Sequence, residues 1–465
     1  MFIAVKNLFR LIRIAYVLAR HKALFPLTIL GIAPVVTFVA QAIPSHTKGR
    51  DGERLAAALE QLGPTFIKLG QALSTRADLM GEAVASDLSR LQDRVPPFPY
   101  DNVLQIIEDE FKQPIGELFS HVESQAVAAA SIAQVHQAIT SDGRKVAVKL
   151  LRPGIEQAMA RDLELFFWLA ALIERTMPSF KRLRPVQVIE TFAQTVKLEM
   201  DFRFEAAAAS ELKENCAGDS GFYVPEIDWQ RTSKRVLTLE WVDAIPILDK
   251  EAIQKAGHDV RQLSRQLAVS FFNQAYRDGF FHADMHPGNL FVNSRGEIVV
   301  VDFGIMGRLD KQTRIYVAEI LRGFLNRDYR HVAQVHFDAG YVPSHHSVAL
   351  FAQACRSIGE PIIGQPVNKI SIARLLMQLF KITEDFDMET QPQLLLLQKT
   401  MMLVEGVGAS LDPDVNMWKL AEPWIEEWGI RNLGPEAKLR DTVKGVLALL
   451  GELPKVIERL VGKPG

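Results

Sequence analysis

The residues best able to do chemistry lie in the stretch FHADMHPGN at positions 281–289. Asp284 offers a carboxylate that could accept a proton or orient a nucleophile beside a transferred phosphoryl group. Asn289, five residues later, offers an amide oxygen that could bind Mg²⁺. The stretch also contains two histidines, so on its own it could equally be a transition-metal site.

A third oxygen ligand follows at Asp302, in the stretch VVVDFG after a predicted hairpin. In protein kinases an Asp-Phe-Gly follows a catalytic loop of the form His-x-Asp-x-x-x-x-Asn, and its aspartate binds the Mg²⁺ that bridges the β- and γ-phosphates of ATP. His282, Asp284 and Asn289 have the spacing of that loop. The order and spacing of the two motifs favour a nucleotide site over a transition-metal site.

A lysine that could bind phosphate comes earlier, in the predicted strand KVAVKLL. Val146 and Val148 alternate with Ala147 and Lys149, so Lys149 shares a strand face with Ala147. A buried lysine needs a carboxylate, because an unpaired buried charge is costly. Kinases supply a glutamate from the following helix.

The stretch KLEMDFRFEAAA offers three carboxylates for this purpose, on Glu199, Asp201 and Glu205. We expect Glu199 to be the partner of Lys149, with Glu205 as the second choice. A solvated acidic helix face is the alternative interpretation.

Alanines replace the glycine-rich loop that covers the phosphates in kinases. Ala128, Ala129 and Ala130 stand at that place, followed by Ser131. Alanine restricts the backbone more than glycine does, so the sequence predicts a stiffer lid with the Ser131 hydroxyl available to phosphates. Farther along, the backbone from Glu240 to Val242 stands where kinases bind the adenine edge, an assignment that depends on order alone.

The elements that must position these residues alternate in type along the chain. Periodicity predicts helices at 51–76 with a break at Gly63-Pro64, and at 98–120, 158–176 and 186–215. It predicts strands within 131–151, 222–229, 235–242 and 288–304. Most of the chain after 243 reads as helical, so we expect an α+β fold with two lobes.

Composition bounds the possible functions. The 465 residues are 48% hydrophobic and carry a net charge of −2, which gives no reason to expect a nucleic-acid partner. The two cysteines, Cys216 and Cys355, make neither a disulfide framework nor a zinc site, and they favour a reducing compartment.

The N-terminal segment is unusual. Lys6, Arg10, Arg13 and Arg20 fall on one side of a predicted amphipathic helix. An uncharged run at 23–43 follows, interrupted by two prolines. Interfacial or re-entrant membrane attachment, a membrane span, and packing on the protein's own core all stay open for it.

Taken together, these stretches resemble the ABC1/ADCK/UbiB group of atypical protein-kinase-like proteins, over residues of about 50 to 430. The quoted matches are GPTFIKLGQALSTRADLM, AAASIAQVH, VAVKLLRPG, LEMDFRFEA, FFHADMHPGN, VDFG and QPQLLLLQKTMMLVEGVG. The resemblance implies a two-lobed kinase-like fold with its own N-terminal helical extension. Members of the enterobacterial type also carry hydrophobic C-terminal helices, and the apolar run before Glu452 is too short for one.

The resemblance divides the chain into predicted segments with different roles. They are a membrane-associating segment at 1–50, a helical extension at 51–125, an N-lobe at 126–242, a mostly helical C-lobe at 243–435 and a tail at 436–465. The family's Lys-x-Gly-Gln motif falls on Lys68, Gly70 and Gln71 in the extension. It implies that Lys68 points towards the nucleotide or the Glu-x-Asp carboxylates, and Gly70 would allow another backbone to approach closely.

The resemblance also implies a function. ATP and Mg²⁺ are the expected ligands, with Lys68, Lys149 and Asp284 as catalytic residues and Asn289 and Asp302 as metal ligands. The expected role is that of an ATPase or small-molecule or lipid-linked kinase in ubiquinone biosynthesis, on the cytoplasmic side of the bacterial inner membrane. Polyprenyl-phenol quinone precursors and other ubiquinone biosynthesis proteins are the implied partners.

Two other functions compete with this one. A catalytically quiet scaffold or lipid-precursor chaperone is the main alternative. A flavin hydroxylase should show an early strand-linked G-x-G-x-x-G, and the sequence has none.

Overall fold

The computed structural model describes residues 2–25, 49–74, 81–88, 91, 96–176, 184–361, 382, 385–388, 391–415 and 420. The chain divides into two compact units. The first unit comprises Met1–Lys213, Pro225–Val242 and Asp302–Gly304, and the second comprises Glu214–Val224, Asp243–Val301 and Ile305–Gly465. Both contain helices and sheet, which confirms the predicted α+β class.

An antiparallel sheet forms the centre of the first unit. Its strands in spatial order are β1 (Phe119–Val122), β3 (Ala133–Thr140), β4 (Lys145–Leu151) and β6 (Val236–Glu240), and β2 (Ala128–Ala129) pairs with β3. Val146, Val148 and Leu150 are fully buried on one face of β4, as their alternation in the sequence predicts. The predicted strand–turn–strand unit is therefore confirmed.

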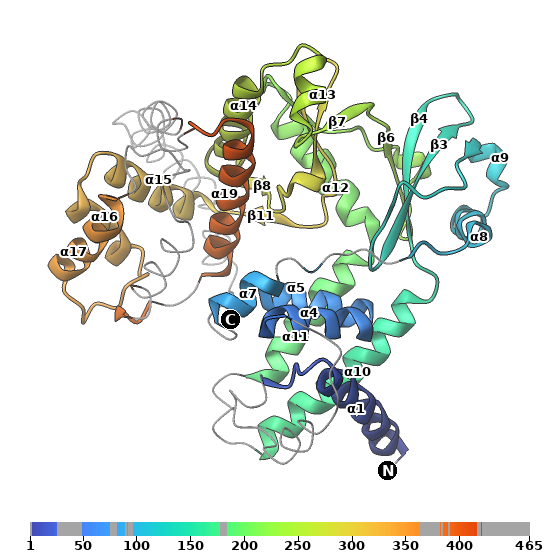
Figure 1. Ribbon diagram of the computed structural model, residues 1–465, viewed down its shortest axis with the longest axis horizontal. Helices are drawn as coiled ribbons and strands as arrows, with labels where there is room; N and C mark the ends of the chain where they lie inside the picture. Colours follow the sequence, from blue (N-terminus) through green and yellow to red (C-terminus); the bar gives the residue numbers. More distant parts are fainter. Residues whose placement is uncertain are drawn as a thin grey trace, which may run out of the picture. The chain divides into compact units, whose positions relative to one another are not determined.

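Two helices cover that apolar face, α8 (Tyr100–Phe111) and α9 (Ile115–Leu118), and Figure 1 shows them beside β3 and β4. Val103, Ile106 and Ile107 of α8 join Val146 and Val148 in one buried cluster. The helix pair expected at 98–120 is thus present, and β1 begins at its end.

Helices α4 (Asp51–Leu62), α5 (Pro64–Ser74) and α7 (Glu82–Leu88) lie together (Figure 1). The predicted break between the first two is at Gly63, whose φ of +108° suits glycine. Helix α5 is held to α10 (Ile155–Thr176) by a 2.7 Å hydrogen bond from Thr65 to Asp162 and by an edge-to-face contact of Phe66 with Phe166.

The N-terminal helix α1 (Phe2–Arg20) also contacts α10. Arg10 forms an ion pair with Asp162 and donates to the Arg161 carbonyl, so it points into the first unit. Phe9, Ile12 and Tyr16 remain exposed. The predicted apolar run at 23–43 lies outside the described residues from position 26 onward, and so does the whole of the predicted tail at 436–465.

The prediction of a single helix at 186–215 is wrong. Two helices, α11 (Pro185–Glu199) and α12 (Phe202–Asn215), occupy the range. The Asp201 carboxylate accepts the backbone N–H of Arg203 at 3.2 Å, which satisfies a donor at the start of α12. The two-residue break decides which way each glutamate points.

Two sheets form part of the second unit. One has the order β5 (Phe222–Tyr223), β10 (Ile298–Val300), β9 (Leu290–Asn293) and β7 (Ala244–Pro246), and the other pairs β11 (Met306–Arg308) with β8 (Phe280–His282). The strand predicted over 222–229 is therefore cut short at Tyr223. Pro225 has no N–H for the ladder, and only Ile227 bridges onward, to Leu239 of β6.

The helices of the second unit form two groups in Figure 1. Helix α14 (Val260–Phe272) lies beside α19 (Pro392–Leu411), and α13 (Lys250–Lys255) leads into α14. Helices α15 (Lys311–Leu325), α16 (Tyr329–Asp338) and α17 (Val348–Gly359) share a buried cluster that contains Tyr329, Val332 and Phe351. Among the described helices, α19 is the one long and apolar enough to cross a membrane, but core helices have the same composition.

Candidate functional site

Lys149 of β4 holds two carboxylates. Its ammonium donates to Glu205 at 2.8 Å and to Asp302 at 3.1 Å. The Lys149 and Glu205 side chains are 14% and 8% exposed, whereas Asp302 is 52% exposed. The prediction that Glu199 pairs with Lys149 is wrong, and the second choice, Glu205, makes the contact.

Local structure fixes this arrangement. Glu205 lies on the first turn of α12, which starts at the buried Phe202, and the Lys149 ammonium lies 5.5 Å from the Phe202 ring centroid. The Glu205 carboxylate also accepts the backbone N–H of Phe303, the residue after Asp302. Glu205 therefore connects the strand lysine to the Asp-Phe-Gly segment.

Charge keeps Lys149 protonated. Burial alone would lower the pKa of its ammonium, but Asp302 and Glu205 outweigh burial and raise that pKa above its ordinary value. Asp302 has a φ of +64°, a left-handed conformation that aspartate tolerates better than most residues. Because one lysine faces two carboxylates, the group has a surplus of negative charge that suits a cation.

Lys68 of α5 forms a second ion pair, with Glu199 at the end of α11, at 2.9 Å. The two side chains are only 13% and 17% exposed. The expectation that Lys68 points towards a Glu-x-Asp carboxylate is confirmed for Glu199. Gln71 lies nearly one turn later on α5 and is half-buried.

Asp201, the other carboxylate of that motif, is used locally. Its two oxygens accept from the Arg203 guanidinium at 2.9 and 2.6 Å, and these bonds lower the pKa of the Asp201 carboxyl. Since Asp201 also accepts the Arg203 backbone N–H, it orders the break between the helices.

Gly70 gives room to two leucines. A methyl group at this position would lie 2.4 Å from Leu91 and 2.7 Å from Leu59. The expected close approach of a backbone is wrong, because side chains fill the space. Glycine thus lets α5 pack tightly on its neighbours.

The alanine segment is a strand of a hairpin. Ala128 and Ala129 pair with Val135 and Gln134 of β3, and the N–H of Ala130 donates to Ala133 at 2.8 Å. The backbone here is already bonded along the hairpin, in agreement with a stiff segment.

Arg152, the residue after β4, is hydrogen-bonded to the turn of this hairpin. Its guanidinium donates to the carbonyl of Ala130 at 2.9 Å, and its backbone N–H donates to that of Ile132 at 2.9 Å. Ser131 is fully buried, and its hydroxyl has no hydrogen-bond partner among the described residues. A buried hydroxyl without a partner fits a ligand better than it fits an apolar core.

The segment assigned to adenine is partly occupied by backbone hydrogen bonds. Glu240 donates its N–H to Glu226 at 2.8 Å, and Trp241 donates to Lys145 at 3.1 Å. These bonds belong to the first unit's own sheet. Val242 follows directly and is half-buried.

In the second unit, Asp284 and Asn289 contact each other. The Asn289 amide donates to the Asp284 carbonyl at 3.0 Å and to its carboxylate at 3.2 Å, which turns the amide oxygen away from Asp284. The Asp284 N–H donates to Nδ1 of His282 at 3.3 Å, and His282 is fully buried. His282 therefore supports the loop.

Three residues that the sequence argument missed hold this loop. Lys399 lies 3.8 Å from the Asp284 carboxylate, and Thr400 donates to the Ala283 carbonyl at 3.2 Å. Gln274, in the π-helical turn Asn273–Asp278, accepts the His282 N–H at 3.1 Å. Two of them lie on α19, in the family match QPQLLLLQKTMMLVEGVG, but that match gave them no role, and Thr400 is 117 residues from Ala283.

The alternative transition-metal site in this loop is not supported. Nδ1 of His282 accepts the Asp284 N–H, and Nδ1 of His286 accepts that of Gly288 at 3.2 Å. Among the described residues, these histidines and Asp284 do not bring three ligand atoms together.

Each unit by itself carries side chains of the kind that bind Mg²⁺ or phosphate. Carboxylate and amide oxygens, from Asp302 and Asn289, are the ligands that Mg²⁺ prefers. Val301, one residue before Asp302, donates its N–H to the Asn289 carbonyl at 3.0 Å. Lys149 carries a charge of the sign that phosphate attracts, and the buried Ser131 hydroxyl has no hydrogen-bond partner among the described residues.

Comparison with known proteins identifies the chain's relatives. The model of the ABC1 atypical kinase-like domain matches residues 90–336, and that of the UbiB helical domain matches 355–416. The protein named probable protein kinase UbiB of Marinobacter nauticus is 42% identical over 96% of this chain and 83% of its own length. That of Azotobacter vinelandii is 42% identical over 87% and 76%.

A solved structure agrees with the kinase-like fold. The Rv3197–erythromycin complex from Mycobacterium tuberculosis matches with a TM-score of 0.56 at 25% identity, over 79% of this chain and 94% of the other. The predicted kinase-like fold class is confirmed. Matched along most of its length by UbiB-named proteins, the chain belongs to the ABC1 atypical kinase-like family.

Proposed function

We propose that this chain binds Mg²⁺ and ATP and transfers or hydrolyses the terminal phosphate. The observation that carries the proposal is the buried contact of Lys149 with Glu205 and Asp302. A lysine held by two carboxylates is costly to bury for structure alone, and it suits a site that receives a metal and phosphates.

Each residue then has a chemical role. Glu205 would keep the Lys149 ammonium in place, and Asp302, the more exposed carboxylate, would hold the metal. Bound Mg²⁺ would neutralise phosphate charge. Asn289 contributes its amide oxygen to the metal, and Asp284 orients or deprotonates the group that attacks the phosphate.

The remaining site residues would bind the nucleotide or support the machinery. Ala128, Ala129, Ala130 and Ser131 form the lid over the phosphates, and backbone groups from Glu240 to Val242 receive adenine. Lys68, with Gln71 beside it and Glu199 as its partner, restrains access to the phosphates. We keep the predicted segment boundaries at 50, 125, 242 and 435 as part of this proposal, since they separate the segments to which these roles are assigned.

The biological role we propose is ubiquinone biosynthesis, which follows from the UbiB name of the relatives. An ATPase or a small-molecule or lipid-linked kinase would serve it, with polyprenyl-phenol precursors and other biosynthetic proteins as partners. The cytoplasmic side of a bacterial inner membrane is the proposed location.

Nucleotide binding is tested by titrating the protein with ATP with and without Mg²⁺. Lys149→Ala should abolish binding, and Asp302→Asn should remove its Mg²⁺ dependence. Lys145→Ala is the matched control, because Lys145 lies on the same strand with an exposed side chain. Wild-type protein that binds no ATP in the presence of Mg²⁺ would refute the proposal.

The variant Asp284→Asn distinguishes the proposed enzyme from the scaffold alternative. If Asp284 takes part in turnover, this variant should bind ATP but fail to rescue a quinone-deficient strain. Full rescue would favour the catalytically quiet scaffold or lipid-precursor chaperone.

Membrane contact has its own support, in the exposed row of Phe9, Ile12 and Tyr16 on α1. Arg13 lies on the same exposed side, whereas Arg10 is bound to Asp162. Phe9→Ser with Tyr16→Ser should reduce cosedimentation with anionic liposomes. Leu350→Ser is the control, because Leu350 is an exposed apolar residue in another helix. Equal binding by both variants would argue against α1 as the contact.

A further inference from the structure

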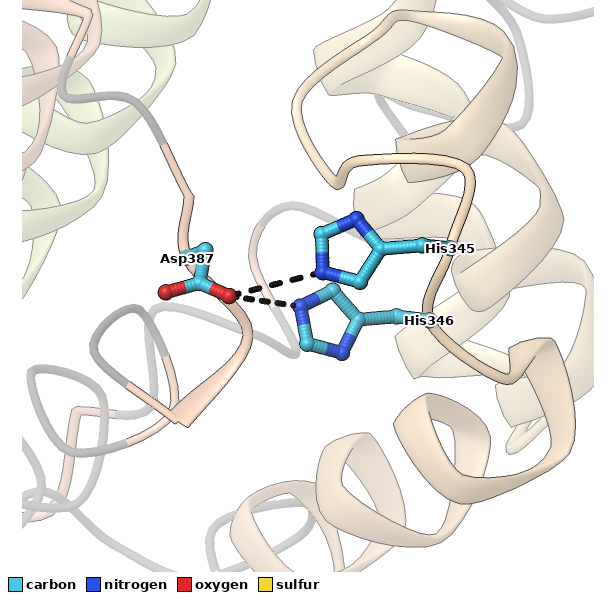
Figure 2. A group of neighbouring side chains, drawn as sticks. All are labelled: His345, His346 and Asp387. Carbon is cyan, nitrogen blue, oxygen red and sulfur yellow. Dashed lines mark hydrogen bonds and ion pairs between the residues drawn. The ribbon is translucent and has the colours of Figure 1, made fainter.

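Three side chains of the second unit that the proposed function does not use, His345, His346 and Asp387, lie close together. His345 and His346 lie in the loop between α16 and α17, and Asp387 lies in the described piece 385–388. Figure 2 shows both imidazoles directed at one oxygen of the Asp387 carboxylate. The Nε2 atoms of His345 and His346 are 3.5 and 3.0 Å from that oxygen.

These distances suit a metal ion. Zinc bound by imidazole and carboxylate has bonds of about 2.0–2.2 Å, so two ligand atoms at tetrahedral corners are separated by about 3.4 Å. The two measured distances lie on either side of that value. All three ligand atoms lie within 4.8 Å of one another, so small movements would close them around one ion.

The loop is already held in position. His346 precedes Ser347, whose hydroxyl accepts the Leu350 N–H and caps α17. The His346 ring contacts the Phe386 ring at 5.3 Å between centroids, and Phe386 contacts Phe351 at 4.9 Å. Phe351 is 2% exposed, so this row of aromatic contacts connects His346, and Asp387 through its neighbour Phe386, to a buried residue. A binding site gains affinity when its ligands are fixed beforehand.

An ordinary surface ion pair explains the arrangement less well. One histidine would satisfy the carboxylate, yet both direct Nε2 at the same oxygen, with ring centroids only 4.1 Å apart. One divalent cation would bind both Nε2 atoms and the carboxylate oxygen at once.

We propose that His345, His346 and Asp387 form a site for a borderline divalent transition-metal ion of the zinc class, with water completing the coordination. Imidazole nitrogen selects such ions over Mg²⁺, so this site is distinct from the proposed nucleotide site. The bound ion would fasten the loop before α17 to a segment 41 residues farther along the chain.

Zinc alone is the probe. The dialysed full-length chain is titrated with Zn²⁺ against a competing chelator, and bound metal is counted by mass spectrometry. The wild type should bind one zinc per chain through this site, and excess Mg²⁺ should not displace it. His346→Ala and Asp387→Asn should each weaken that binding by about 10-fold or more.

His121→Ala is the matched control, because His121 is an exposed histidine paired with one carboxylate, Glu123, at 3.2 Å. It should leave zinc binding unchanged. Asp387→Asn preserves the side-chain shape at a residue with φ of +49°, so circular dichroism should find it folded. Wild type that takes up no zinc, or variants that bind it as tightly as wild type, would overturn the site.

Discussion

The two units hold the carboxylates described above beside a cation in different ways: one closely and buried, one loosely and exposed. In the first, Glu205 and Asp302 lie 2.8 and 3.1 Å from the Lys149 ammonium, and two of the three side chains are almost buried. In the second, Lys399 lies 3.8 Å from the Asp284 carboxylate, and both side chains are about one third exposed.

The difference separates two tasks. Charges removed from water need close partners, so the first unit must be built around complete pairs. A carboxylate that remains in contact with water needs no such partner, and it stays accessible to a substrate. We infer that the first unit fixes Lys149 and its carboxylates in position for the proposed nucleotide. The second unit leaves the Asp284 carboxylate accessible to the proposed substrate.

The largest expected effect comes from breaking the buried contact. Lys149→Met keeps the apolar stem but leaves Glu205 without its cation, so the free energy of unfolding should fall by about 3 kcal/mol. Urea unfolding measures it. The double variant Lys149→Met, Glu205→Met should recover much of the loss, because the carboxylate then left without its cation, Asp302, is 52% exposed and stays in contact with water.

Lys145→Met serves as the control on the same strand and should change the unfolding free energy by less than about 0.5 kcal/mol. If Lys149→Met were equally harmless, Glu205 would not depend on its cation. The contrast between the units would then be lost.

Glu405 on α19 is a buried carboxyl in the second unit, and it sharpens the comparison. It is 7% exposed, and no ion pair joins it to a described residue. Burial raises the pKa of the Glu405 carboxyl from 4.5 to about 7. Where Glu205 is balanced by a lysine, Glu405 is expected to take up a proton.

The stability consequence has a definite sign. The folded chain binds this proton more tightly than the unfolded chain does, so its contribution is fully present below pH 4.5 and is lost as the pH rises to about 7. The loss should be about 3 kcal/mol. Unfolding measured across this range should show the decline in wild type and lose it in Glu405→Gln. Glu251→Gln, at an exposed helix position, should keep it.

A smaller effect is expected from Lys68 and Glu199. Their ion pair is 2.9 Å long and mostly buried, so a double-mutant cycle with Lys68→Ala and Glu199→Gln should give a coupling energy of about 1–2 kcal/mol. The exposed pair Lys213–Glu226, 3.7 Å apart, is the control and should give less than about 0.5 kcal/mol. Equal coupling in both pairs would show that Lys68 is only a surface residue.

Much of the fold could be predicted because local patterns determine it. Alternation identified β3 and β4, and Gly63-Pro64 marked the break between α4 and α5. The end of α11 was missed because KLEMDFRFEAAA reads as a continuous helix, whereas the Asp201 side chain competes for the backbone N–H of Arg203.

The motif spacing assigns Asp284 and Asn289 to one loop, and the structure shows the two side chains in contact there. The choice between Glu199 and Glu205 depended on a break in the helix that spacing does not reveal. Lys399 and Thr400 lie in a stretch that matches the family, but their contacts could not be predicted from the sequence, because only the packing of α19 brings them to the loop.

The smallest expected effect tests whether Asp284 is lightly held. Lys399→Met removes the cation 3.8 Å away, and since both side chains are about one third exposed, the unfolding free energy should change by less than about 0.5 kcal/mol. Thr400→Val is the informative neighbour, because it removes a hydroxyl whose one hydrogen lies between the Leu396 carbonyl at 2.8 Å and the Ala283 carbonyl at 3.2 Å, and it should cost about 1 kcal/mol. A loss for Lys399→Met as large as that for Lys149→Met would mean that Asp284 is clamped by its cation. Both units would then hold their carboxylates in the same way.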